Sequence, residues 1–86
     1  MENSVFILQN FGKISFSFDK VMDEKQINRN QLSKRAGIRF EVANRFYNGD
    51  IERLDIDVLA KVCFVLDCNV ADVMSFERPK EQGNSA

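Results

Sequence analysis

The stretch that decides the fold is Asn28-Arg29-Asn30-Gln31-Leu32-Ser33-Lys34-Arg35-Ala36-Gly37-Ile38. Asn28 and Gln31 have the spacing of a capping box, in which each side chain accepts a hydrogen bond from the backbone N–H of the other residue. Gly37 suits the left-handed backbone conformation just past a helix end. This pattern therefore predicts a short helix over 29–36 that stops at a glycine turn.

A second short helix is predicted only two residues after the turn. Phe40, Ala43 and Phe46 recur at helical spacing, and Asn48-Gly49 provides the next stop, so we expect this helix at about 40–48. Two short helices joined by a tight glycine turn are the geometry by which proteins present a helix to the major groove of DNA.

The charge of the chain supports this interpretation. The formal net charge is −1, but residues 1–24 carry two basic and four acidic side chains, residues 25–53 carry seven and three, and residues 54–86 carry three and six. The predicted helix pair therefore lies in a basic island of charge +4 between acidic flanks, as a surface that binds a polyanion requires.

Local signals predict the other elements. A helix start at Ser17, an N-cap at Asp55 and a capping box formed by Asn69 and Asp72 each precede a run of apolar residues at helical spacing. We therefore expect three further helices, at about 18–26, 56–67 and 70–76. Before them, residues 5–16 are expected to form an extended strand or a hairpin that turns near residues 10–12.

These residues, together with Leu66-Asp67-Cys68-Asn69-Val70-Ala71-Asp72-Val73, resemble the Cro/lambda-repressor-like (XRE-type) helix-turn-helix family, in particular its short bacterial and phage regulators. The resemblance covers about residues 14–76. It implies an all-α, five-helix DNA-binding domain at 18–76, with an extended N-terminal arm at 1–17 and a disordered tail at 77–86. It also implies a cytoplasmic transcriptional regulator without a cofactor.

The helix at 40–48 supplies the candidate base-reading residues. Arg39 and Arg45 can each donate two hydrogen bonds to guanine, and Asn44 can pair with adenine. Glu41 can accept from cytosine, and Phe40 can contact a thymine methyl group. The simpler interpretation makes the two arginines a solvated surface and places Phe40 in the core. The family usually has a serine or threonine where Arg39 stands and a polar residue where Phe40 stands, so no relative supplies the target sequence.

The candidate phosphate contacts flank this helix on both sides. Asn28, Arg29 and Asn30 lie at a helix N-terminus, whose unpaired N–H groups and positive dipole end favour an anion. Asn48 and Arg53 are expected to contact phosphates on the other side of the reading helix.

The helix at 56–67 is more apolar than the packing of one face requires. We expect Val58 and Val62 to be covered within the chain, and Phe64 and Val65 to form a contact between two subunits. A strand within residues 5–16 would be a second dimerisation device, because the edge of an isolated hairpin remains unpaired.

The composition argues against other classes of protein. Without histidine the chain lacks the usual acid-base group of neutral pH and the imidazole ligand of zinc, so we expect neither an enzyme nor a metal site. The two cysteines are expected to be reduced, which favours the cytoplasm. Apolar runs of at most four residues and a start without basic residues predict neither a membrane span nor a secretion signal.

A second functional class remains open. A protein-interaction module, such as an antirepressor or an antitoxin, would keep the helix-turn-helix fold. It would use its acidic flanks and the apolar helix at 56–67 to bind another protein. The sequence pI of about 5.3 is compatible with that function. Double-stranded DNA and a second copy of the chain are the expected partners, and no small-molecule ligand is expected.

Overall fold

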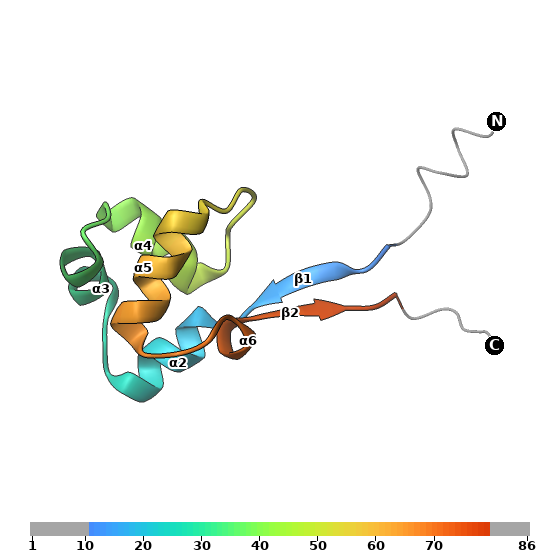
Figure 1. Cartoon of the computed structure of the whole chain (residues 1–86), viewed down its shortest axis with the longest axis horizontal. Helices are drawn as coiled ribbons and strands as arrows, with labels where there is room; N and C mark the ends of the chain where they lie inside the picture. Colours follow the sequence, from blue (N-terminus) through green and yellow to red (C-terminus); the bar gives the residue numbers. More distant parts are fainter. Residues whose placement is uncertain (1–10, 80–86) are drawn as a thin grey trace.

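The computed structural model describes residues 11–79. Its elements in chain order are β1 (Lys13–Phe16), α2 (Phe18–Lys25), α3 (Arg29–Ala36), α4 (Phe40–Asn48), α5 (Ile56–Leu66), α6 (Val70–Val73) and β2 (Met74–Glu77). The helices pack into one body, and the two strands form a ribbon that projects away from it (Figure 1). The expected all-α, five-helix architecture with an extended N-terminal arm is confirmed.

The capping box of α3 is present. The side-chain oxygen of Asn28 accepts from the Gln31 N–H at 2.8 Å, and the Gln31 side-chain oxygen accepts from the Asn28 N–H at 2.9 Å. Gly37 ends the helix with φ +68°. Because both ends are set by local contacts, the predicted range 29–36 is confirmed, and α4 also has its predicted range.

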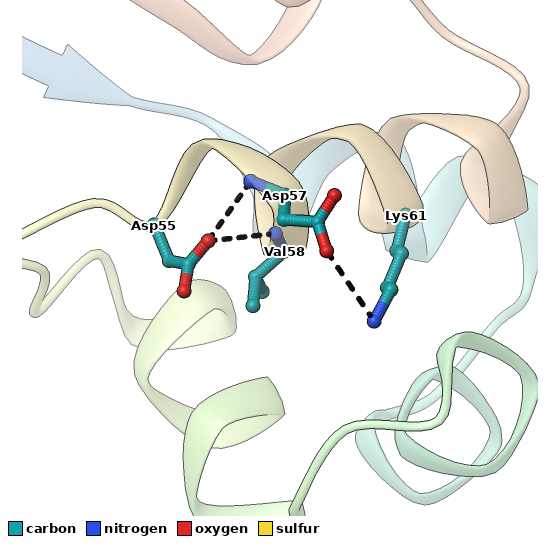
Figure 2. Close-up of polar contacts among 4 residues, drawn as sticks. All are labelled: Asp55, Asp57, Val58 and Lys61. Atoms are coloured by element: carbon teal, nitrogen blue, oxygen red, sulfur yellow. Dashed lines mark hydrogen bonds and ion pairs between the residues drawn. The ribbon is translucent and has the colours of Figure 1, made fainter.

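The start of α5 is held by Asp55 (Figure 2). Its carboxylate accepts from the backbone N–H groups of Asp57, at 2.9 Å, and Val58, at 3.3 Å. One turn further on, Lys61 and Asp57 form an ion pair at 3.8 Å on the exposed surface of the helix. Asp55 is therefore the N-cap that the sequence predicts.

The fifth helix is much shorter than predicted. The capping box of Asn69 and Asp72 forms, but α6 ends at Val73, and Met74–Glu77 is the strand β2 instead of helix. The helical prediction over 70–76 fails because β2 pairs antiparallel with β1, about sixty residues away in the chain. That pairing outweighs the local spacing of apolar residues.

The same pairing gives the predicted N-terminal strand a partner that the sequence does not indicate. Residues 13–16 form a strand, as expected, but their partner is β2, in the register Lys13↔Glu77 to Phe16↔Met74. One edge of β1 is thereby paired within the chain, not left open for a second subunit. The rest of the expected arm, residues 1–10, lies outside the described residues, as does most of the expected tail.

The ribbon has one polar and one apolar face. Lys13 and Glu77 form an ion pair at 3.8 Å, and the hydroxyls of Ser15 and Ser75 share a hydrogen bond at 2.8 Å. Side chains alternate between the faces of a strand, so the opposite face is apolar and comprises Ile14, Phe16, Met74 and Phe76. At its base, Ser17 joins the ribbon to the body, because its N–H donates to the Val73 carbonyl at 2.8 Å.

The core lies between all five helices, α2 to α6. Its largest fully buried side chains are Phe18, Met22, Leu32, Val62, Leu66 and Val73. The rings of Phe18 and Phe46 meet edge to face, with centroids 4.8 Å apart. On α5 the prediction that Val62 is covered within the chain is confirmed, whereas Ile56, in the first turn, is 73% exposed.

Candidate nucleic-acid interface

The turn between α3 and α4 fixes how the second helix is presented. The Ser33 hydroxyl donates to the Ile38 carbonyl at 2.6 Å, and the Ile38 N–H donates to the Ser33 carbonyl at 3.0 Å. A Cβ at Gly37 would meet no atom within 4 Å, so the positive φ, and not crowding, requires glycine there. The Ser33 hydroxyl thus joins the two sides of the turn.

The two faces of α4 differ as a reading helix requires. Ala43 and Phe46 are buried in the core, whereas Phe40, Glu41 and Arg45 are exposed. Phe40 is 49% exposed, so it is not a core residue and remains available for an apolar contact. The structure therefore leaves Phe40, Glu41 and Arg45 on the outward face of α4 exposed.

The charges on this face are only weakly engaged. Arg39, just before α4, lies 3.9 Å from the Glu41 carboxylate, but the two side chains are 83% and 73% exposed. An ion pair in such contact with water contributes little and does not hold the arginine in place. Within residues 11–79, Arg45 and Arg53 form no ion pair. Their guanidinium groups are therefore free to bind an anion.

A cluster that the sequence did not predict links α2, α3 and α4. Arg29, a candidate phosphate contact, donates from Nη1 to the side-chain oxygen of Asn44, a candidate base-reading residue, at 2.6 Å. The Arg29 guanidinium also lies over the Tyr47 ring, 5.1 Å from its centroid. The Tyr47 hydroxyl in turn donates to the Asp23 carboxylate at 3.1 Å. This hydrogen bond and the negative charge of Asp23 raise the pKa of Tyr47 above its usual value.

The N-terminus of α3 shows how the other phosphate candidates are placed. The side-chain oxygen of Asn28 is committed to the capping box, which leaves its amide N–H groups for an anion. Asn30 and Asn48 are both exposed, at the start of α3 and the end of α4. Arg53 lies in the loop between α4 and α5, so the structure places cations on both sides of α4.

A cavity of about 520 Å³ lies beside α4, where the loop at 49–55 returns to α5. Arg45 and Arg53 line it together with the carboxylates of Asp50, Glu52 and Asp55, and its remaining lining is Val42, Phe46, Ile51 and Val58. The acidic side chains near α4 thus lie beside Arg45 of α4 and Arg53 of the loop that follows it.

The predicted dimer residues differ in exposure. Phe64 is 86% exposed, whereas Val65 is half-buried and packs against the core. Both line a shallow hollow between α3 and α5, which also includes Ala36, Ala60 and Lys61. Val58, like Val62, is covered within the chain, as expected.

The two cysteines lie apart from this surface, at the end of α5. Both are free thiols. The partial burial of Cys68 and, next to it, the Cys63 thiol raise the pKa of Cys68 to about 11. Within residues 11–79 no three cysteine or acidic side chains gather into a possible metal site. No helix in that range is long and apolar enough to cross a membrane.

A glycine turn between two short helices, the second with an uncovered polar face and arginines on either side, defines a helix-turn-helix DNA-binding domain. The chain belongs to the family of Cro/C1-type HTH DNA-binding domains, whose family model matches residues 17–79. No curated protein matches the sequence.

Two solved structures share the fold. One is described as a "putative DNA-binding protein from Bacteroides fragilis"; it is 19% identical, the match covers 73% of this chain and 100% of that chain, and the TM-score is 0.64. The other is the transcriptional regulator VanUg, which is 15% identical over 84% of this chain and 95% of that chain, with a TM-score of 0.63. At these identities the likeness concerns the fold alone.

Proposed function

We propose that this protein is a sequence-specific transcriptional regulator, a repressor that binds operator DNA as a homodimer in the cytoplasm. The observation that carries the proposal is the outward face of α4. This face presents the unpaired Arg45 and also Asn44, whose amide is hydrogen-bonded to Arg29 of α3. A helix of this kind fits the major groove, where bases are distinguished by their donors and acceptors.

The proposed base contacts follow from the chemistry of the α4 side chains. Arg39 and Arg45 donate to guanine, and Asn44 contacts adenine. Glu41 accepts from cytosine, and Phe40 contacts a thymine methyl group. Because Arg39 is shared with Glu41, whereas Arg45 has no carboxylate partner among the described residues, Arg45 is the strongest candidate for a guanine contact.

The proposed phosphate contacts hold α4 in the groove from both sides. Asn28, Arg29 and Asn30 bind one strand from the N-terminus of α3, where backbone N–H groups and the helix dipole add to the attraction. Asn48 and Arg53 bind the phosphates on the opposite side. These contacts set position and affinity but carry no sequence information.

Dimerisation through α5 is supported by the exposed ring of Phe64, with Val65 at its border. A single small module makes few base contacts, so two linked modules gain strongly in affinity. A two-fold operator then has half-sites about one helical turn, roughly 34 Å, apart. A regulator bound across a promoter represses by occupying it.

Selection of binding sites from random duplexes tests the proposal. The wild type should enrich a two-fold sequence, and Arg45→Ala should lose the preference at one base pair in each half-site, by roughly 5- to 150-fold. Lys20→Ala, on the exposed surface of α2, is the matched control and should keep the wild-type sequence. Failure to enrich any sequence would refute the proposal.

Phe64→Glu tests the exposed α5 surface, which both candidate functions use. For a DNA-binding homodimer, this variant should sediment as a monomer and bind the selected duplex more weakly. A protein-interaction module would instead lose a protein partner, and its wild type would bind DNA without sequence preference. The exposed α5 surface is common to both functions, so the DNA selection decides between them.

A further inference from the structure

We propose that Arg29 is a positioning residue for sequence reading: it holds the Asn44 amide in one orientation and so sets the base preference of that side chain. The inference rests on the proposed function, because it concerns how the same surface reads DNA. It goes further by giving one cation at the α3 N-terminus a role beyond phosphate binding.

The orientation follows from the chemistry of the two groups. A guanidinium group has only donors, so the atom of Asn44 that faces Arg29 must be the amide oxygen, as the contact of 2.6 Å between Nη1 and Oδ1 shows. The amide nitrogen then points away from Arg29. Within residues 11–79 the structure records no acceptor for its two N–H groups.

Arg29 is itself held in place by Tyr47 of α4. Its guanidinium lies over the Tyr47 ring at 5.1 Å, and the Tyr47 hydroxyl is bound to Asp23 on α2. Arginine side chains lose considerable rotamer freedom when they are ordered, and stacking on a fixed ring reduces that loss on DNA binding. Tyr47 therefore fixes the side-chain conformation of Arg29 in the free protein, and Arg29 fixes that of Asn44.

This arrangement has a consequence for recognition. An asparagine whose amide is free to flip can present either its oxygen or its N–H groups to a base edge. With Arg29 in place, Asn44 presents N–H donors, which bind the acceptors of guanine, adenine or thymine and reject the N4 amino group of cytosine. The remaining N–H groups of Arg29 stay available for a phosphate.

The test compares Arg29→Met with Arg53→Met in the full chain. Methionine removes the donors and keeps a helix-compatible side chain of similar length, so neither variant disturbs the buried core. On duplexes that differ only at the base pair contacted by Asn44, Arg29→Met should lose discrimination roughly 2- to 13-fold, the value of one hydrogen bond. Arg53→Met should weaken all these duplexes equally. If Arg29→Met also weakens them all equally, the positioning role is refuted.

Tyr47 provides a second, matched pair of variants. Tyr47→Phe keeps the ring beneath Arg29 and should retain discrimination at the Asn44 base pair, whereas Tyr47→Leu removes the ring and should lose part of it. The reverse order would overturn the proposed support of Arg29 by Tyr47. Thermal melting of each variant confirms that the fold is retained.

Spectroscopy of the free protein separates this inference from the proposed function. The side-chain amide resonances of Asn44 should shift in Arg29→Met and stay unchanged in Arg53→Met; unchanged resonances in both would refute the contact. If the wild type selects no sequence, the proposed function and the reading role both fail. If the wild type selects a sequence that Arg29→Met reads equally well, only the positioning role fails.

Discussion

Replacement of Arg53 by methionine tests the proposed phosphate contacts on the far side of α4. Arg53 is exposed in the loop between α4 and α5 and has no ion pair within residues 11–79. Its substitution therefore breaks no intramolecular salt bridge of the described region. The expected effect is confined to the electrostatic part of DNA binding, which the dependence of affinity on salt measures directly.

The size of the effect follows from counterion release. Each phosphate that a cation neutralises contributes about 0.9 to the slope of log affinity against log salt concentration. A homodimer that loses Arg53 from both subunits should have a slope smaller by about 1.8. Between about 50 and 200 mM salt, the advantage of the wild type over the variant should then shrink by about 12-fold.

Fluorescence anisotropy with a labelled operator duplex, titrated at several salt concentrations, measures this slope. Arg78→Met is the matched control, because Arg78 follows directly after β2, lies over the Phe76 ring at 5.6 Å and is not among the proposed DNA contacts. Its slope should equal that of the wild type. An unchanged slope for Arg53→Met would refute the phosphate contact, and a decrease of about 0.9 would show that one subunit binds alone.

Three further predictions concern the fold. Asp55→Ala should destabilise the protein by about 1 kcal/mol and lower its melting temperature by about 4–8 °C in a circular dichroism melt, whereas Asp57→Ala should change it little; equal effects would contradict the capping role. Gly37→Ala should cost about 1 kcal/mol because φ is +68°, and an unchanged denaturant midpoint would contradict the strain. Cys68, whose raised pKa is about 11, should react slowly with iodoacetamide near neutral pH and faster as pH rises towards that value; a midpoint near that of a free thiol would contradict its burial.

The sequence predicts α3 and α4 to the residue because each depends on neighbours in the chain. The exchange of hydrogen bonds between Asn28 and Gln31 spans three residues, and the left-handed turn at Gly37 belongs to a single residue. Such signals act within one helical turn, so they can be recognised without knowledge of the fold. The N-cap of α5 at Asp55 is predicted for the same reason.

Elements that depend on distant partners were predicted wrongly. Val70 and Val73 have the spacing of a helix that continues to residue 76, and nothing local indicates that β1 will pair with the following residues. Ile56 has helical spacing with the buried Leu59 and Leu66, but it stands in the first turn of α5 and is 73% exposed. Periodicity predicts which face of a helix is apolar, not how far along the helix that face is covered.

The candidate site shows the same limit on a smaller scale. The sequence predicts Arg29 and Asn44 each as a DNA contact but does not indicate their contact with each other, because fifteen positions separate them. Their contact depends on the angle between α3 and α4, which is set by the Gly37 turn, and on the ring of Tyr47 beneath the guanidinium. A long, flexible arginine side chain binds whichever acceptor or ring the packed helices place within its reach. The base preference of such a surface is therefore a property of pairs of side chains, and substitutions on α3 should change which bases α4 selects.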